Sequence, residues 1–164
     1  MGAYFITIVA WQRERLFGEI ADGEMMLNDF GKIVHNEWEQ TAVVRPNVEL
    51  GDYVVMPNHF HGILVFVDDG AYTVGTQNVG ATRRVAPTTT LQSGSLGAVM
   101  AQFKSIVTKR INVLRGVSGI PVWQRNYYDH IIRDERELDR ITRYIESNPF
   151  AWVDDDENPL HIKM

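Results

Sequence analysis

The chain has 164 residues, 45% of them hydrophobic and 23% charged, which is enough for one domain with a sizeable core and argues against disorder throughout. It contains no cysteine, which excludes a disulfide framework, thiolate metal ligands and cysteine catalysis. The apolar start lacks a basic leader, and no apolar run approaches the roughly 20 residues of a membrane span. We therefore expect a cytoplasmic protein that does not contact a membrane.

Residues 3–11 are rich in β-forming side chains and predict a first strand. Residues 17–27 place Asp22-Gly23 between two apolar stretches, which predicts a hairpin. A helix is expected to begin at Asn28 or Asp29, either of which can cap it, and to run to about Val44.

The middle of the chain predicts two more strands and a long loop. Residues 48–56 form one strand and residues 59–67 the next, with Pro57-Asn58 as the break between them. The second strand is apolar on both faces beyond Gly62, which indicates a central, buried position. Residues 70–94 are rich in Gly, Thr, Ser, Asn and Gln and are interpreted as a mobile loop within a single domain that spans 1–164.

The last part of the chain predicts two helices separated by a strand. Residues 95–114 have apolar side chains at helical spacing, and residues 128–133 predict a short strand. A final helix is expected from after Asp134 to about Ser147, with Leu138, Ile141 and Ile145 facing the core, and we expect 153–164 to be a loose tail. The order without the hairpin and the last helix is β-α-β-β-α-β, so we predict an α+β, ferredoxin-like or RRM-like antiparallel sheet.

Positive charge is concentrated in one segment. The formal net charge of −5 argues by itself against a nucleic-acid partner, yet residues 71–126 contain no Asp or Glu. The basic residues of this segment are Arg83, Arg84, Lys104, Lys109, Arg110, Arg115 and Arg125. Such a segment can attract phosphate whatever the overall charge, although one face of a protein can also be basic without binding DNA.

Two histidines stand out in the strand at 59–67. His59 and His61 are two residues apart, so alternation along a strand places both side chains on one face. Two imidazoles fixed on one face of a sheet can bind a divalent metal. A pair at this spacing also occurs by chance, and two sheet histidines that hydrogen-bond to their neighbours are the slightly favoured interpretation of the pair alone.

The sequence around these histidines resembles a known family. Residues 54–64, VVMPNHFHGIL, resemble the HUH motif of single-tyrosine transposases, and the string "MPNHxH" recurs in the REP-associated tyrosine transposases. Residues 123–152 resemble that family's second block, which ends in "YIxxNP". Residues 95–112 resemble the helix between the blocks, and residues 4–20 resemble the amino-terminal block. The similarity covers most of the chain in the right order.

The resemblance implies a set of site residues. His59 and His61 match the paired metal ligands, and Tyr144 on the last helix matches the nucleophilic tyrosine. Asn148 falls where relatives place a polar side chain that completes the metal site, and positions i and i+4 share one face of a helix. Tyr127 and Tyr128 are competing nucleophiles, but both precede the strand and lack a polar partner four residues later.

The family chemistry implies that a tyrosine oxygen attacks phosphorus and leaves a 5′-phosphotyrosine and a free 3′-hydroxyl, with Mg²⁺ or Mn²⁺ as the metal. The expected partner is single-stranded hairpin DNA, contacted by the basic residues named above, and a homodimer is slightly favoured over a monomer. Two other functions stay open. The domain could bind single-stranded nucleic acid without cleaving it, or a metal-activated water could hydrolyse a phosphodiester.

Overall fold

The computed structural model describes residues 2–67 and 94–155. Nearly all of the expected loop at 70–94 and residues 156–164 of the expected tail lie outside the described residues, as do Arg83 and Arg84. No helix within the described ranges is long and apolar enough to cross a membrane.

Four strands form one antiparallel sheet in the order β4-β5-β1-β6. They are β1 (Gly2–Val9), β4 (Val48–Met56), β5 (His59–Phe66) and β6 (Tyr128–Ile132). The expected hairpin forms a separate two-stranded sheet of β2 (Gly18–Ala21) and β3 (Glu24–Leu27), turning at Asp22 and Gly23, which both have positive φ.

Each of the three longer helices begins at a side-chain cap. Asn28 caps α1 (Asp29–Val44), Ser95 caps α3 (Leu96–Leu114), and Asp134 caps α4 (Glu135–Ser147), each by accepting a hydrogen bond from a backbone N–H three residues later. Two short 3-10 helices, η1 (Trp11–Arg13) and η2 (Trp152–Asp154), follow β1 and α4. The expected helix boundaries therefore hold to within one or two residues.

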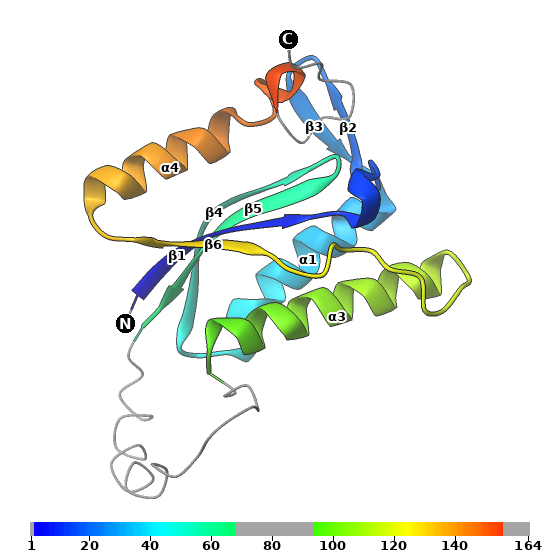
Figure 1. Cartoon of the computed structure of the whole chain (residues 1–164), viewed down its shortest axis with the longest axis horizontal. Helices are drawn as coiled ribbons and strands as arrows, with labels where there is room; N and C mark the ends of the chain where they lie inside the picture. The colour runs from blue at the N-terminus through cyan, green and yellow to red at the C-terminus, as the bar shows by residue number, and fades with distance from the viewer. Residues whose placement is uncertain (1, 68–93, 156–164) are drawn as a thin grey trace, which may run out of the picture.

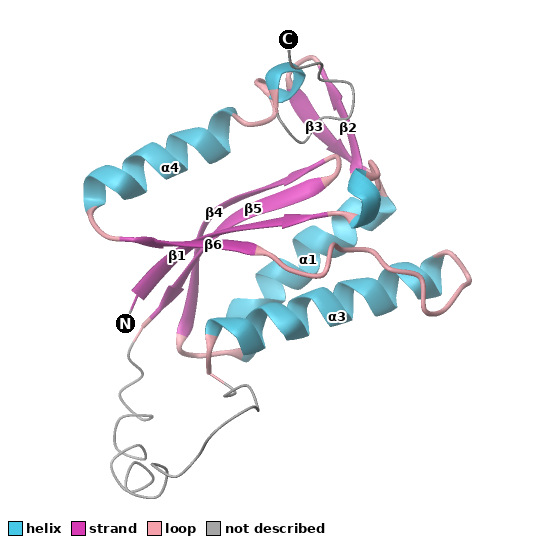
Figure 2. Ribbon diagram, in the orientation of Figure 1, coloured by secondary structure: helices cyan, strands magenta, loops and turns pink. Residues whose placement is uncertain are grey.

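The sheet has helices on both faces (Figure 1, Figure 2). α1 and α3 cover one face, and α4 lies over the other. Successive side chains of β5 point to opposite faces of the sheet, so they contact different helices. Phe60 packs against Trp38 of α1, with ring centroids 4.7 Å apart, in the main core. His59 and His61 face α4, as does Ile63, which packs against α4 residues Ile141 and Ile145.

The architecture confirms the α+β, ferredoxin-like prediction, because α1 and α3 occupy the two helix positions of that arrangement. α4 is additional and lies on the opposite face of the sheet. Its core-facing stripe is shorter than expected: Ile141 and Ile145 are buried, but Leu138 is exposed. Leu138 lies in the first turn of α4. This turn is beside the edge strand β6, where the adjacent Glu137 bonds His130.

Candidate active site

The two histidines project from the centre of the sheet toward α4. His59 lies between Val9 of β1 and Met56 of β4, and His61 lies between Thr7 and Val54 in the next row on the same face. Both imidazoles are almost completely buried, and their ring centroids are 4.6 Å apart. The prediction that they share one face is confirmed.

Asn58 fixes the orientation of the His59 ring. The Asn58 amide nitrogen donates to the Arg13 carbonyl at 3.2 Å, which turns the amide oxygen toward His59 Nδ1 at 2.9 Å. An amide oxygen can only accept, so Nδ1 carries the proton and Nε2 of the neutral ring carries a lone pair. That Nε2 atom is buried and has no hydrogen-bond partner among the described residues. The carboxylate oxygen Asp155 Oδ2 lies 3.6 Å from it.

His61 is held by a similar contact on its other nitrogen. Thr7 Oγ1 lies 2.8 Å from His61 Nδ1, and the Phe5 ring stacks on the imidazole with centroids 5.3 Å apart. These two β1 side chains direct Nε2 away from the sheet. It points at the Tyr144 hydroxyl, 3.4 Å away on α4.

Burial keeps both imidazoles neutral. Desolvation lowers the pKa of His59 to about 4, although the Asp155 carboxylate and Asn148 act in the opposite direction. Burial, followed by the neighbouring His59, lowers the pKa of His61 well below its ordinary value. Neutral imidazole is the form that binds a metal, so neither ring would need to lose a proton to do so near pH 7.

α4 places Tyr144 and Asn148 on the same side, facing the histidines. Tyr144 is 47% exposed, whereas Asn148 is buried, and the Asn148 amide nitrogen donates to the Tyr144 carbonyl at 3.4 Å. This contact turns the Asn148 amide oxygen away from the helix. That oxygen is buried and, like His59 Nε2, has no hydrogen-bond partner within the described part of the chain.

Asp155 is a site residue that sequence reasoning missed. It was included in the expected loose tail, but the described portion of that tail, 153–155, continues from the buried Trp152. The Trp152 ring stacks on His59 at an interplanar angle of 29°, with centroids 6.1 Å apart, and the Asp155 backbone N–H donates to the Trp152 carbonyl at 3.0 Å. The apolar pair Trp152-Val153 directly before an acidic run is the sequence signal that this segment packs against the domain.

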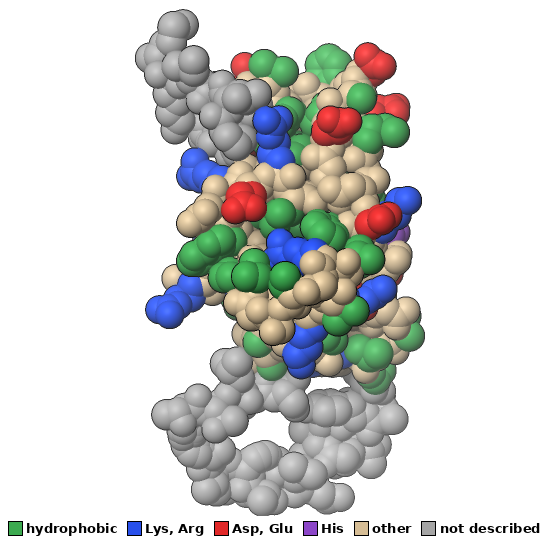
Figure 3. Space-filling model, turned by 90° about the vertical axis from the view of Figure 1, so that its right-hand side faces the viewer, with side chains coloured by type: hydrophobic (Ala, Val, Ile, Leu, Met, Phe, Trp, Pro, Cys, Tyr) green, Lys and Arg blue, Asp and Glu red, His purple; other side chains and the backbone are tan. Residues whose placement is uncertain are grey.

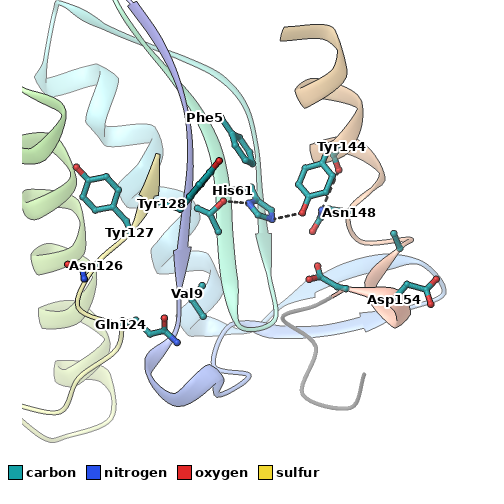
Figure 4. Close-up of a pocket in the computed structure, with 13 residues that line it drawn as sticks. Phe5, Val9, His61, Gln124, Asn126, Tyr127, Tyr128, Tyr144, Asn148 and Asp154 are labelled. Atoms are coloured by element: carbon teal, nitrogen blue, oxygen red, sulfur yellow. Dashed lines mark hydrogen bonds between the residues drawn. The ribbon is translucent and has the colours of Figure 1, made fainter. Parts of the chain in front are cut away.

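A cleft of about 790 Å³ brings these groups together (Figure 4). Its floor is the β1 and β5 face of the sheet, one wall is α4 with the segment that follows it, and the other wall is the segment that leads into β6. The lining includes His61, Tyr144, Asn148 and Asp155. Tyr127 and Tyr128 also line it, so proximity to the cleft does not by itself exclude them as nucleophiles.

Of the basic residues that the sequence predicts to contact DNA, those within the described ranges are not among the residues that line the cleft. α3 lies across the sheet from the cleft (Figure 1), and its Lys104 ammonium donates to the Gln124 and Arg125 carbonyls at 2.9 Å each. Arg110 pairs with Glu37 at 2.6 Å, and Arg115 donates to Asn112. Figure 3 shows Lys and Arg side chains scattered over one face of the molecule, among hydrophobic, acidic and other side chains. DNA contact by Lys104, Lys109, Arg110, Arg115 and Arg125 stays a prediction.

Comparisons with known proteins show which protein shares a family with this chain and which shares its fold. No family model matches it. An uncharacterized protein of Haemophilus influenzae is 38% identical over 157 residues, which cover 94% of this chain and 83% of that protein. A REP-associated tyrosine transposase, solved bound to a REP hairpin, matches with a TM-score of 0.57 and 18% identity over 90% of this chain and 66% of that one. The chain therefore belongs to the same family as the Haemophilus influenzae protein, and its fold is that of the REP-associated tyrosine transposase.

Proposed function

We propose that this protein cleaves and rejoins single-stranded DNA, with Tyr144 as the nucleophile. One observation carries the proposal: the Tyr144 hydroxyl lies 3.4 Å from His61 Nε2 in a shared cleft, although the two residues are 83 apart in sequence. The shared fold supports it. Tyr144 and His61 of the same chain face each other, so we propose that Tyr144 acts on DNA held by its own histidines, whether or not a homodimer forms.

The buried donor atoms fit a divalent cation. His59 Nε2 and Asn148 Oδ1 are both buried without hydrogen-bond partners among the described residues, and an unpaired buried polar group costs about 1–3 kcal/mol. A cation between them would satisfy both. No group of three or more His, Asp or Glu side chains within the described ranges is arranged to hold a metal, so the set needs the Asn148 oxygen. We propose His59, His61 and Asn148 as ligands of Mg²⁺ or Mn²⁺, with the Asp155 charge beside them.

Each residue then has a defined task. When bound, the metal would polarise the scissile phosphate and stabilise the charge of the transition state. Tyr144 Oη forms a bond to phosphorus and loses its proton, while the bond to the 3′-oxygen breaks and that oxygen leaves as a hydroxyl. A phenol has an ordinary pKa near 10, and the partial exposure of Tyr144 offers its proton a path to solvent. Attack by a 3′-hydroxyl on the phosphotyrosine reverses these changes and rejoins a strand.

The shared fold supports a proposal for the substrate class. The matching transposase was solved with a REP hairpin, so we propose that a single strand folded into a hairpin is the substrate here. The cleft extends to the residues just before β6, among them Gln124 and Asn126. An unpaired strand can enter an opening of this kind between the sheet and α4.

The test is the covalent intermediate. The full chain is incubated with Mn²⁺ and labelled single-stranded hairpins, and a protein–DNA adduct is sought on a denaturing gel. We expect an adduct with the native chain, none with Tyr144→Phe, and an undiminished adduct with Tyr127→Phe, which removes a hydroxyl from another tyrosine that lines the cleft. His59→Ala and His61→Ala should abolish the adduct, and chelation of the metal should do the same.

Other outcomes would overturn the proposal in distinguishable ways. An adduct that survives in Tyr144→Phe but disappears in Tyr127→Phe would reassign the nucleophile. Cleavage without any adduct would indicate a metal-activated water. Binding of hairpins without cleavage or adduct across a range of sequences would indicate a non-catalytic binding domain.

A further inference from the structure

The cleft continues past the histidines to the edge of the sheet. Tyr128 of β6 pairs with Thr7, which pairs on its other side with His61, so the three side chains form one row on the cleft face. The Gln124 backbone N–H donates to the Val9 carbonyl at 2.8 Å, which places Gln124 beside the row that contains His59. Gln124 and Tyr128 both line the cleft (Figure 4).

The backbone that carries these two side chains is held firmly. Lys104 donates to the carbonyls of Gln124 and Arg125, and the preceding Trp123 is buried and forms a bridge with Ala10. Both backbone polar groups of Gln124 are therefore used within the fold. Its side-chain amide, in contrast, makes no hydrogen bond within the described part of the chain, and Tyr128 is 59% exposed. A fixed backbone with uncommitted side chains is the arrangement expected of a preorganised binding site.

The chemistry of the pair matches a nucleobase. An exposed tyrosine ring offers a stacking surface that accepts any base, and an amide offers one acceptor and two donors for the edge of a base. The pair lies two strands from His61, about 9–10 Å at the usual strand spacing. This separation matches the base of a nucleotide whose phosphate, or whose neighbour's phosphate, sits at the histidines.

We infer that Tyr128 and Gln124 form a base-binding subsite for a nucleotide next to the scissile phosphate. Tyr128 stacks on the base, and Gln124 hydrogen-bonds to its edge and sets which base is preferred. The inference rests on the proposed function, since it assumes that the cleft holds a DNA strand. A second hollow of about 440 Å³, lined in part by Lys104 and Arg125, shares Asn126 and Tyr127 with the cleft. It gives the strand a route from this subsite toward α3.

The test measures binding without catalysis. The full chain is titrated, in chelator and without metal, against fluorescent hairpins that carry a single-stranded extension, and anisotropy gives the dissociation constant. Each position of the extension in turn is made A, C, G, T or abasic. At one position we expect an abasic site to weaken binding by roughly 5- to 150-fold, which is the range that corresponds to stacking one base on an aromatic ring.

The variants separate the two roles. Tyr128→Ala is expected to weaken binding by a similar factor and to remove the abasic penalty, whereas Tyr128→Phe keeps the ring and should retain both. Gln124→Ala is expected to equalise the four bases at that position while the abasic penalty remains. Gln40→Ala, an equivalent change on the exposed side of α1, serves as the matched control and should change neither quantity.

The possible results distinguish failure of the subsite from failure of the proposed function. Unchanged base discrimination in Gln124→Ala together with an unchanged abasic penalty in Tyr128→Ala, in variants that still bind hairpins, would refute the subsite alone. A native chain that shows no abasic penalty at any position would also refute it. Failure to bind any hairpin would instead refute the proposed function. Thermal unfolding of each variant confirms that it is folded, which is expected because both side chains lie at the surface of the cleft.

Discussion

Replacing Asn58 by alanine is expected to affect both stability and metal binding, because its side chain is completely buried and joins two parts of the chain. The amide bonds His59 Nδ1 at 2.9 Å and the Arg13 carbonyl at 3.2 Å. The variant leaves the His59 N–H without this acceptor in a buried position, at a cost of about 1–3 kcal/mol, and any loss at the Arg13 carbonyl adds to that. We expect the free energy of unfolding to fall by about 2–4 kcal/mol in metal-free buffer.

The same substitution is expected to weaken Mn²⁺ binding. Asn58 determines which His59 nitrogen carries the proton, and loss of such a partner behind a metal ligand typically costs about 10- to 100-fold in affinity. Urea denaturation and calorimetric titration with Mn²⁺ measure the two effects. Asn36→Ala, on the exposed side of α1, is the matched control and should change stability by less than about 0.5 kcal/mol. If Asn58→Ala resembles this control in both assays, the orientation assigned to His59 is wrong.

Two further predictions concern Asp155, in the segment after α4, and Glu137, in the first turn of α4. Asp155→Asn removes the charge 3.6 Å from His59 Nε2 and is expected to weaken Mn²⁺ binding. The variant should stay folded, because asparagine has the same shape as aspartate. Equal Mn²⁺ affinity of the variant and the native chain in calorimetry would exclude the carboxylate from the site. Glu137 accepts hydrogen bonds from His130 and from the Arg133 backbone, which lower its pKa. A lowered pKa adds stability above the ordinary carboxyl pKa of about 4.3 that is lost as pH falls through the folded value. The stability advantage over Glu137→Gln should therefore shrink below about pH 4.5 in denaturation curves; a constant difference from pH 6 to pH 3 would contradict this.

The features that depend on local pattern could be predicted from the sequence. Alternation placed His59 and His61 on one face, as the register confirms. Apolar periodicity and capping residues located α1 and α3, and the spacing of Asp134 and Glu137 predicted the cap that starts α4. These are interactions between residues at most four apart, or repeats along a single element, and the sequence displays them directly.

The features that depend on long-range packing could not be predicted in this way. The acid-free segment at 71–126 suggested that the Lys104 charge faces phosphate, but Lys104 is partly buried and bonds two backbone carbonyls about 20 residues away. Asp155 was assigned to a tail because nothing within a few residues of it indicates contact with His59. Both assignments depend on which face of the sheet a segment crosses, and no short-range pattern encodes that choice.

α4 is attached to the sheet in a way that bears on how Tyr144 works. Among the described residues, its apolar contact consists of Ile141 and Ile145 packed on Ile63, with a few partly buried neighbours, whereas the opposite face of the sheet buries the main core. A polar contact supplements it near the start of the helix, where Glu137 bonds His130 of β6. At the other end Asn148 is buried, but its amide nitrogen donates to the Tyr144 carbonyl of the same helix, and its amide oxygen has no hydrogen-bond partner among the described residues. We therefore expect a metal held by Asn148 and the histidines to tie this end of α4 to the sheet and to fix the distance between the Tyr144 hydroxyl and His61. Metal binding and placement of the nucleophile would then be coupled through a single side chain.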